Sequence, residues 1–387
     1  SIDYYLFDSE LNPLDDIPFT TLDEEHNFTE LADGLYYYNV TITDKVGLQG
    51  STETRNITLD TTGPEVGFTD KTEQNETYKN QNFVFVEVDV NESNFGKIIY
   101  TLYNSSLDIF RQKNLLDLIA EFNFLNLEDG IYYYDVAVED KVGLERSTET
   151  RSITLDTTPP TINYIEPTPA DNLYHNQDFI DITTTITEAN VDTVTYTLYD
   201  LDGNTIGTPI TLQEDYDSYT FETLADGIYT YDVKVTDKAG SEVTTLPRTI
   251  TIDTTEPTID YITPTPENNS YYNQEDLIIF TTIAEDNIET ITYTLYDENI
   301  VPITPQDFED LTQQATFEDL GGKTYYYDVT VRDKVGLQAF TETRLITIDT
   351  TPPQVTFTDD EPDGSVLVLR NSISILVDIV EQNINKI

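Results

Sequence analysis

The chain has no cysteine and no methionine among its 387 residues, and it has only two histidines. Without cysteine, a secreted domain must be held together by its core, by cations or by neighbouring domains, because no disulfide can form. No run of the sequence approaches 18 apolar residues, so we expect no membrane insertion in this segment. Because residue 1 is a serine, we expect that a leader was removed or that the sequence is an internal piece.

Basic residues are also scarce: 19 Lys and Arg face 73 Asp and Glu, which gives a net charge of −54. Nucleic acid is excluded as a partner, because binding phosphate requires clustered basic side chains. Anionic membrane surfaces are excluded for the same reason. Three interpretations remain open: solubility of a long extracellular object, binding of divalent cations, or adaptation to high salt.

What the chain does contain is a repeated motif, clearest as DGIYYYDVAVEDKVG from Asp129. Each copy is followed by a strand-like run and then by the tripeptide DTT. The period is about 97 residues, which is the size of one small domain. The motif begins at Asp33, Asp129, Asp226 and Gly322, and the DTT tripeptides begin at Asp60, Asp156, Asp253 and Asp349.

The repeat at residues 161–253 shows apolar and polar residues in alternation, with turn signals every 8–12 residues. This pattern predicts an all-β unit of about seven strands, a sandwich of the immunoglobulin type. Residues 106–127 are an exception, because a 3.6-residue spacing predicts a helical turn inserted between two strands. The Leu-x-Asp-Gly-x-Tyr pattern predicts a tyrosine corner, whose hydroxyl bonds to nearby backbone. It occurs at Leu31/Tyr36, Leu127/Tyr132 and Leu224/Tyr229, and Leu320/Tyr325 keeps the tyrosine without Asp-Gly.

Taken together, D-G-x-Y-x-Y-x-V-x-V-x-D-x-x-G followed by D-T-T-x-P resembles the bacterial and archaeal Ig-like domains found in tandem. Such domains occur in surface adhesins, surface-layer proteins and stalk or filament proteins. The resemblance covers essentially the whole chain. It implies an extracellular, cell-surface location and a spacer or adhesive array that is often stiffened by cations.

The DTT tripeptides mark the expected domain boundaries, and the domains are expected to stack end to end. Both chain ends fall inside a repeat, and the last residue aligns next to the first. Either the sequence is one window of a longer tandem chain, or each copy completes its neighbour by donating strands. We therefore expect residues 1–60 to be the C-terminal part of a domain, residues 65–156, 161–253 and 258–349 to be complete domains, and residues 354–387 to be an N-terminal part.

No catalytic constellation is visible. His26 and His175 occupy non-equivalent positions, and no Ser-His-Asp pairing or glycine-rich phosphate loop occurs. We therefore do not expect an enzyme. The lysine after each motif aspartate (Lys45, Lys141, Lys238 and Lys334) lies in a turn, where we expect a solvated charge.

Carboxylates and amides gather where the poles of stacked sandwiches would meet, and these are the oxygen ligands that calcium prefers. The sequence thus predicts calcium at the interdomain junctions, against the alternative that each aspartate only caps a turn. The candidate set at the first junction is Asp33, Asp60, Glu92, Asn94 and Asp140. The set at the second is Asp129, Asp156, Glu188, Asn190 and Asp237, and the set at the third is Asp226, Asp253, Glu285, Asn287 and Asp333.

Seven Asn-x-Ser/Thr triplets could accept N-glycans. They lie at Asn27, Asn39, Asn56, Asn75, Asn91, Asn104 and Asn268. We predict an extracellular structural protein that forms a filament, stalk or cell-surface tether, whose partners are copies of itself end to end. The alternatives are an adhesin that binds glycans or another cell surface, for which the 103–124 insertion is the candidate loop, and a surface-layer component.

Overall fold

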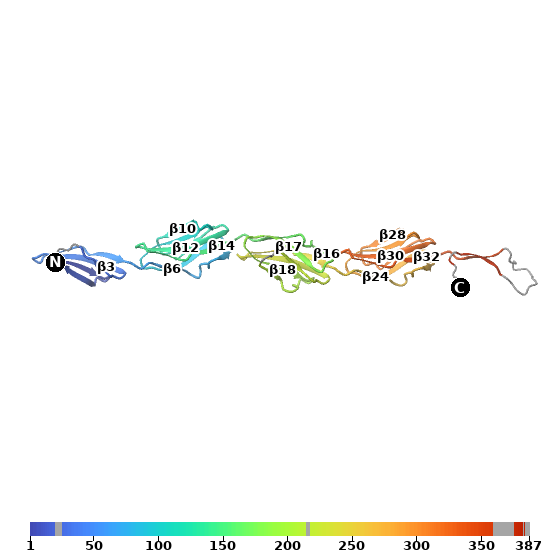
Figure 1. The fold of residues 1–387 in the computed structure, drawn as a ribbon, viewed down its shortest axis with the longest axis horizontal. Helices are drawn as coiled ribbons and strands as arrows, with labels where there is room; N and C mark the ends of the chain where they lie inside the picture. Colours follow the sequence, from blue (N-terminus) through green and yellow to red (C-terminus); the bar gives the residue numbers. More distant parts are fainter. Residues whose placement is uncertain (20–24, 214–216, 359–374, 382, 384–387) are drawn as a thin grey trace, which may run out of the picture.

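The computed structural model describes residues 1–387 except 20–24, 214–216, 359–374, 382 and 384–387. Its repeats, here called units, follow one another in a single elongated row, with the unit of β3 at one end and the segment after β32 at the other (Figure 1). All regular elements in the described residues are strands, which confirms the all-β prediction. No helix in this described part has the length and hydropathy needed to cross a membrane.

The unit at residues 65–155 is a sandwich of two sheets. One sheet has the order β10-β9-β12-β14-β7, with β13 added on β12, and the other has the order β11-β8-β6. The sandwich has nine strands where the sequence predicted about seven, because β7 and β13 are only three residues long. Its strands are β6 (Glu65–Phe68), β7 (Thr77–Lys79), β8 (Val84–Asn91), β9 (Phe95–Tyr103), β10 (Ile109–Leu115), β11 (Glu121–Phe124), β12 (Gly130–Asp140), β13 (Glu145–Ser147) and β14 (Arg151–Leu155).

The next two units repeat this architecture with the same strand orders. The second complete unit comprises β15 (Thr161–Ile165), β16 (Leu173–His175), β17 (Ile180–Thr187), β18 (Val191–Tyr199), β19 (Ile210–Leu212), β20 (Ser218–Phe221), β21 (Gly227–Asp237), β22 (Glu242–Thr244) and β23 (Arg248–Ile252). The third complete unit comprises β24 (Thr258–Tyr261), β25 (Ser270–Tyr272), β26 (Leu277–Ala284), β27 (Ile288–Tyr296), β28 (Pro302–Phe308), β29 (Gln314–Phe317), β30 (Thr324–Asp333), β31 (Gln338–Phe340) and β32 (Arg344–Ile348).

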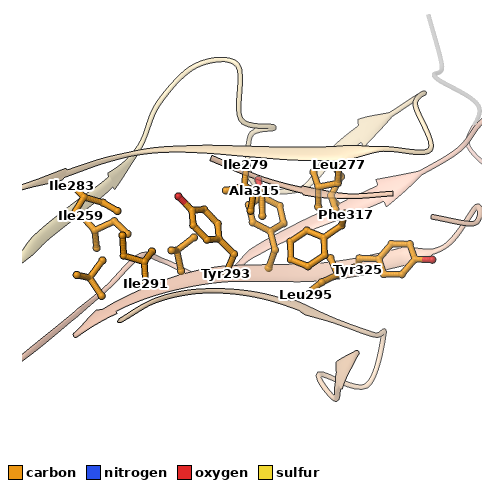
Figure 2. Packing of buried hydrophobic residues seen from close by; sticks show 14 of the residues in the cluster. Ile259, Leu277, Ile279, Ile283, Ile291, Tyr293, Leu295, Ala315, Phe317 and Tyr325 are labelled. Atoms are coloured by element: carbon orange, nitrogen blue, oxygen red, sulfur yellow. The ribbon is translucent and has the colours of Figure 1, made fainter. Parts of the chain in front are cut away.

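The repeated motif forms the central strand of each large sheet. In β30 the residues Tyr327, Val329 and Val331 alternate inward and are 0% exposed, as period-2 patterning requires. They pack against apolar side chains of the small sheet, among them Leu277 and Phe317 (Figure 2). Burying each such side chain stabilises the unit by about 1.5–3 kcal/mol.

The tyrosine-corner prediction is confirmed in the three copies that carry the Asp-Gly pattern. The hydroxyls of Tyr36, Tyr132 and Tyr229 donate to the carbonyl oxygens four residues earlier, at 2.8–3.1 Å. Tyr325 makes the same bond to Gly321 at 3.2 Å, although its corner lacks Asp-Gly. The corner therefore depends on the tyrosine and the chain path, and not on the aspartate.

The predicted helical turn within residues 106–127 is wrong, because this segment contains β10 and β11. Strand β10 pairs antiparallel with β9, with a register shift between Ile109 and Arg111. Such a bulge adds one residue to a strand and breaks its two-residue alternation. The resulting apolar spacing imitates that of a helix.

The units at the two ends of the chain are incomplete sandwiches, with fewer strands in the described residues. The first is a single sheet of β1 (Ile2–Phe7), β2 (Pro13–Phe19), β3 (Gly34–Thr43), β4 (Gln49–Ser51) and β5 (Arg55–Leu59), and the last is the pair β33 (Gln354–Phe357) and β34 (Val377–Val380). Ile42 and Ile57 are 53% and 47% exposed, whereas Val138 and Ile153 at the same positions of the next unit are 0% exposed. Part of the apolar face of the first sheet, around Ile42 and Ile57, is therefore open to solvent, while Ile2 and Leu6 are buried.

Candidate metal centres at the domain junctions

In each complete unit, the aspartate of the Asp-Lys-x-Gly turn is the most buried acid of its junction. In the third complete unit, Asp333 ends β30 and is 0% exposed. Its Oδ1 accepts hydrogen bonds from the backbone N–H groups of Val335 and Leu337 at 3.0 and 2.8 Å. Gly336, with φ at 94°, permits this tight turn, since the left-handed region favours glycine.

The other oxygen of this carboxylate has no partner. Among the described residues, Oδ2 of Asp140, Asp237 and Asp333 is buried without a hydrogen bond. A buried acceptor without a donor is rare in folded proteins, because losing water without compensation costs about 1–3 kcal/mol or more for a charged group. The three oxygens occupy equivalent positions in the three complete units.

At two junctions the turn aspartates lie close to further carboxylates. Ligand oxygens of Asp253, Glu285 and Asp333 lie within 4.8 Å of one another. The same holds for Asp156, Glu188 and Asp237 at the preceding junction. In each group the first residue follows the last strand of one unit, and the other two belong to the next unit. Each group therefore joins two consecutive units.

Neighbouring amides hold these carboxylates in place. Asn287 Nδ2 donates to Asp253 Oδ2 at 2.9 Å, and the backbone N–H of Asn287 donates to Glu285 Oε1 at 2.6 Å. Asn190 makes the equivalent bonds to Asp156 and Glu188 at 2.7 and 2.6 Å. The two asparagines, predicted as ligands, thus use their amide N–H groups to orient the carboxylates. Such outer hydrogen bonds fix ligand geometry in metal sites.

The three negative charges repel one another. Two carboxylates 4.8 Å apart repel by about 3.5 kcal/mol at an effective dielectric constant near 20. Burial raises the pKa of Glu285 above its ordinary value of 4.5, and the charges of Asp253 and Asp333 raise it further. A bound divalent cation would remove this penalty and satisfy the orphaned oxygen, and oxygen-only donor sets suit calcium.

The first junction brings its predicted residues together more loosely. Asp33, Asp60, Glu92 and Asn94 line one cleft of about 580 Å³, and Asn94 Nδ2 donates to Asp60 Oδ2 at 2.7 Å. Asp140 is buried nearby in the same unit, but no three-carboxylate group within 4.8 Å forms there in the described residues. Beyond the third unit, Asn383 donates to Asp349 at 2.7 Å in the same way.

The three corner aspartates predicted as ligands make a different set of bonds. Asp226 Oδ1 accepts from the N–H and hydroxyl of Thr254 at 2.9 and 2.8 Å, and Oδ2 accepts from the Thr255 hydroxyl at 2.5 Å. Asp33 and Asp129 bond to the corresponding DTT threonines. Hydrogen bonds from Thr62, then from Thr61, hold the pKa of Asp33 below its ordinary value. These aspartates tie the linker to the corner and are not members of the carboxylate groups.

Two of the four motif lysines contact tyrosines that the sequence analysis did not single out. Lys238 Nζ lies 5.2 Å from the ring centre of Tyr78, and Lys334 Nζ lies 4.8 Å from that of Tyr174. Both lysines are exposed, as expected, but neither is only solvated. The available signal was a tyrosine at equivalent places in TYK and LYH, the segments that form β7 and β16.

The glycan acceptor candidates differ in accessibility. Asn39 and Asn104 are half-buried, and Asn39 Nδ2 donates to Thr54 at 3.0 Å. Asn75 and Asn268 are exposed, but their Oδ1 atoms accept backbone N–H groups of Ser152 and Leu345. The remaining candidates, Asn27, Asn56 and Asn91, are exposed.

Comparisons with known proteins gave one family match and several similar solved structures. Residues 170–254 match the family model of the bacterial Ig-like domain. The fibronectin(III)-like modules of Clostridium thermocellum CbhA align at 15% identity and a TM-score of 0.29, covering 49% of this chain and 93% of theirs. The FN1–FN3 domains of chicken CNTN1 align at 13% identity and a TM-score of 0.25, covering 74% of this chain and 99% of theirs.

A search of the curated proteins gave no match. Families of bacterial Ig-like domains are often extracellular or surface-exposed and typically non-enzymatic. A tandem array of such units suggests a surface or structural repeat protein. The chain is thus similar to the tandem Ig-like domains of bacterial surface proteins, with residues 170–254 matching the bacterial Ig-like domain itself.

Proposed function

We propose that the chain is an extracellular structural protein whose Ig-like units stack end to end into a filament, stalk or cell-surface tether, with calcium at the junctions. The observation that carries the proposal is the buried, unpartnered Oδ2 of Asp237 and Asp333. Each of these aspartates has a ligand oxygen within 4.8 Å of one carboxylate of its own unit and of one that follows the last strand of the preceding unit. A cation bound there holds two units at once.

In this mechanism the ion acts on the angle between units. Without it, about 3.5 kcal/mol of repulsion per carboxylate pair favours separation of the two poles. With it, carboxylates from both units share one ligand, and the joint closes. The short Thr-Pro linkers act in the same direction, since proline fixes its own φ and restricts the residue before it.

Calcium titration of the whole chain tests this proposal. Isothermal calorimetry should detect binding, and calcium should raise the melting temperature relative to excess EDTA. X-ray scattering should show a longer and less flexible particle with calcium, whereas an equal concentration of sodium chloride should not reproduce this. Identical melting and scattering in calcium and in EDTA would refute the calcium-locked joint.

The partner proposed for each end unit is a matching unit, in the same chain or in a neighbouring copy. In the complete units, an arginine of the last strand lies over an aromatic ring of the first strand, for example Arg151 over Phe68 at 4.6 Å. In the end units the two counterparts are separate: Arg55 is exposed on β5, and Phe357 on β33 is 71% exposed. The open face of β1–β5 therefore matches strands of the type of β33 and β34.

A fluorescent peptide of residues 354–383 tests this match. It should bind the whole chain, and Arg55→Glu should weaken binding because it removes the guanidinium that receives Phe357. Glu53→Gln, which changes the charge of a neighbour but keeps Arg55, is the control. Equal binding by Arg55→Glu and the unaltered chain would contradict the proposed pairing.

A second candidate function, adhesion, is favoured by the surroundings of β10. Leu107, Ile109 and Leu116 are 59%, 61% and 79% exposed, and Phe110 is 47% exposed. Contiguous exposed apolar residues mark interaction sites on many soluble proteins. Glycan-array binding that is lost on Phe110→Ser would support a ligand for this edge, and absence of any ligand after such a screen would leave the structural role alone.

A further inference from the structure

Two lysine–tyrosine pairs cross the junctions between complete units. Tyr78 on β7 belongs to the first complete unit, and Lys238, just after β21, belongs to the second. Tyr174 on β16 and Lys334, just after β30, repeat this arrangement at the next junction. Lys334 Nζ also lies 3.2 Å from the Tyr174 hydroxyl oxygen. Recurrence at both junctions indicates a feature of the joint and not an accident of one surface.

The Asp-Lys turn directs its two charged side chains to different places. Asp333 is 0% exposed and faces the carboxylate group, while the adjacent Lys334 is exposed and reaches the tyrosine of the preceding unit. The backbone N–H of Lys334 donates to the carbonyl oxygen of Asn287 at 2.8 Å, which fixes the turn between the two contacts. One turn thus supplies two separate attachments to the neighbouring unit.

We propose that Lys238 and Lys334, through Tyr78 and Tyr174, set the orientation of consecutive units as a third point of attachment. The covalent linker is the first point, and the hydrogen bond across the junction, from Asn190 to Asp156 or from Asn287 to Asp253, is the second. Two points still allow rotation about the line that joins them, whereas a third point off that line prevents it. This inference rests on the stacked array of the proposed function, but it does not require calcium.

The size of the effect follows from the contact. A lysine ammonium over an exposed tyrosine ring contributes enough to change an equilibrium roughly two- to fivefold. Loss of one lysine should therefore raise the fraction of rotated or bent joints about two- to fivefold. The effect should be largest without calcium, because the carboxylate group then no longer holds the joint.

The absence of cysteine makes the measurement direct, since two introduced cysteines are the only sites for spin labels. Thr244→Cys on β22 and Gln338→Cys on β31 place exposed labels in consecutive units. Electron–electron double resonance on the whole chain in EDTA then gives the distance distribution across the joint. Lys334→Gln and Tyr174→Leu should broaden this distribution, whereas Lys334→Arg and Tyr174→Phe should keep it narrow, because a cation over a ring remains.

Lys45→Gln is the matched control, because it alters the same turn in a unit distant from the labels. Melting temperatures should stay within about 2 °C for all the lysine variants, since an exposed lysine contributes little to its own unit. Distance distributions that are the same for Lys334→Gln and the unaltered lysine in EDTA would overturn the proposal. If the chain binds no calcium but Lys334→Gln still broadens the distance distribution, the calcium site is refuted and this inference is supported.

Discussion

Replacing Asp333 by asparagine should change the stability of its unit in opposite directions with and without calcium. The substitution keeps the shape of the side chain and the acceptor for Val335 and Leu337. It replaces the unpartnered, buried Oδ2 by an amide N–H₂ group. The amide carries no negative charge, so it no longer repels the carboxylates of Asp253 and Glu285, whose ligand oxygens lie within 4.8 Å of that of Asp333.

The magnitude follows from the carboxylate group. Removing the charge of Asp333 eliminates two of three repulsive pairs, each worth about 3.5 kcal/mol at 4.8 Å and a dielectric constant near 20. Screening and local relaxation reduce this sum, so we expect a gain of about 1–3 kcal/mol without cation. For a unit of this size, each kcal/mol shifts the melting temperature by about 4–8 °C. With calcium, the variant loses a charged ligand and should bind the ion at least tenfold more weakly.

Differential scanning calorimetry of the whole chain, in EDTA and in saturating calcium, measures both the gain in stability without cation and the loss of calcium stabilisation. The transition of the altered unit should move up in EDTA and gain less from calcium than the unaltered unit does. Calorimetric titration should show one fewer strong site, because the junction at Asp156 remains intact.

Asp297→Asn is the matched control for the turn chemistry. Asp297 Oδ1 accepts backbone N–H groups two and four residues ahead, at Asn299 and Val301, in the same geometry as Asp333. Asp297 is not part of a carboxylate group in the described residues. If Asp333→Asn destabilises the unit equally with and without calcium, as Asp297→Asn would, the repulsion argument and the cation site are both refuted.

Three further predictions concern single residues. Gly96→Ala should lower the melting temperature, because its Cβ would lie 2.5 Å from the backbone oxygen of Asp140, while Gly67→Ala, with no atom within 4 Å, should not. Tyr231→Phe should cost about 1 kcal/mol in chemical denaturation, because the carbonyl of Pro169 loses its 2.8 Å hydroxyl donor and keeps only the guanidinium of Arg248. The raised pKa of Glu285 penalises folding above that pKa, so lowering the pH through it in EDTA should stabilise the unit, and Glu285→Gln should remove this gain.

Much of the fold could be predicted because each strand obeys a local rule. Alternation in the repeated motif placed Tyr327, Val329 and Val331 on one face, and all three are 0% exposed. The tyrosine corners followed from a six-residue pattern, and their hydroxyl bonds form in all four copies. Such features need no knowledge of distant parts of the chain.

Other features depend on tertiary contacts. The bulge between Ile109 and Arg111 arises where β10 meets β9, and its spacing imitates a helix. The corner aspartates looked like ligands, but the threonines of the following DTT sequence take up their oxygens, as Thr254 and Thr255 do for Asp226. No sequence spacing distinguishes an aspartate that faces a threonine from one that faces a cation.

The junctions that follow Asp60, Asp156 and Asp253 are related in sequence but not equal in geometry. The groups at Asp156 and Asp253 hold three carboxylates within 4.8 Å, while the described residues around Asp60 form no such group. Asp156 and Asp253 are buried, whereas Asp60 is half-buried. A cation bound at Asp60 would meet fewer preplaced charges and would have to draw the units together. Stiffness should therefore differ along the array, and the junction at Asp60 should be the first to bend when calcium becomes limiting.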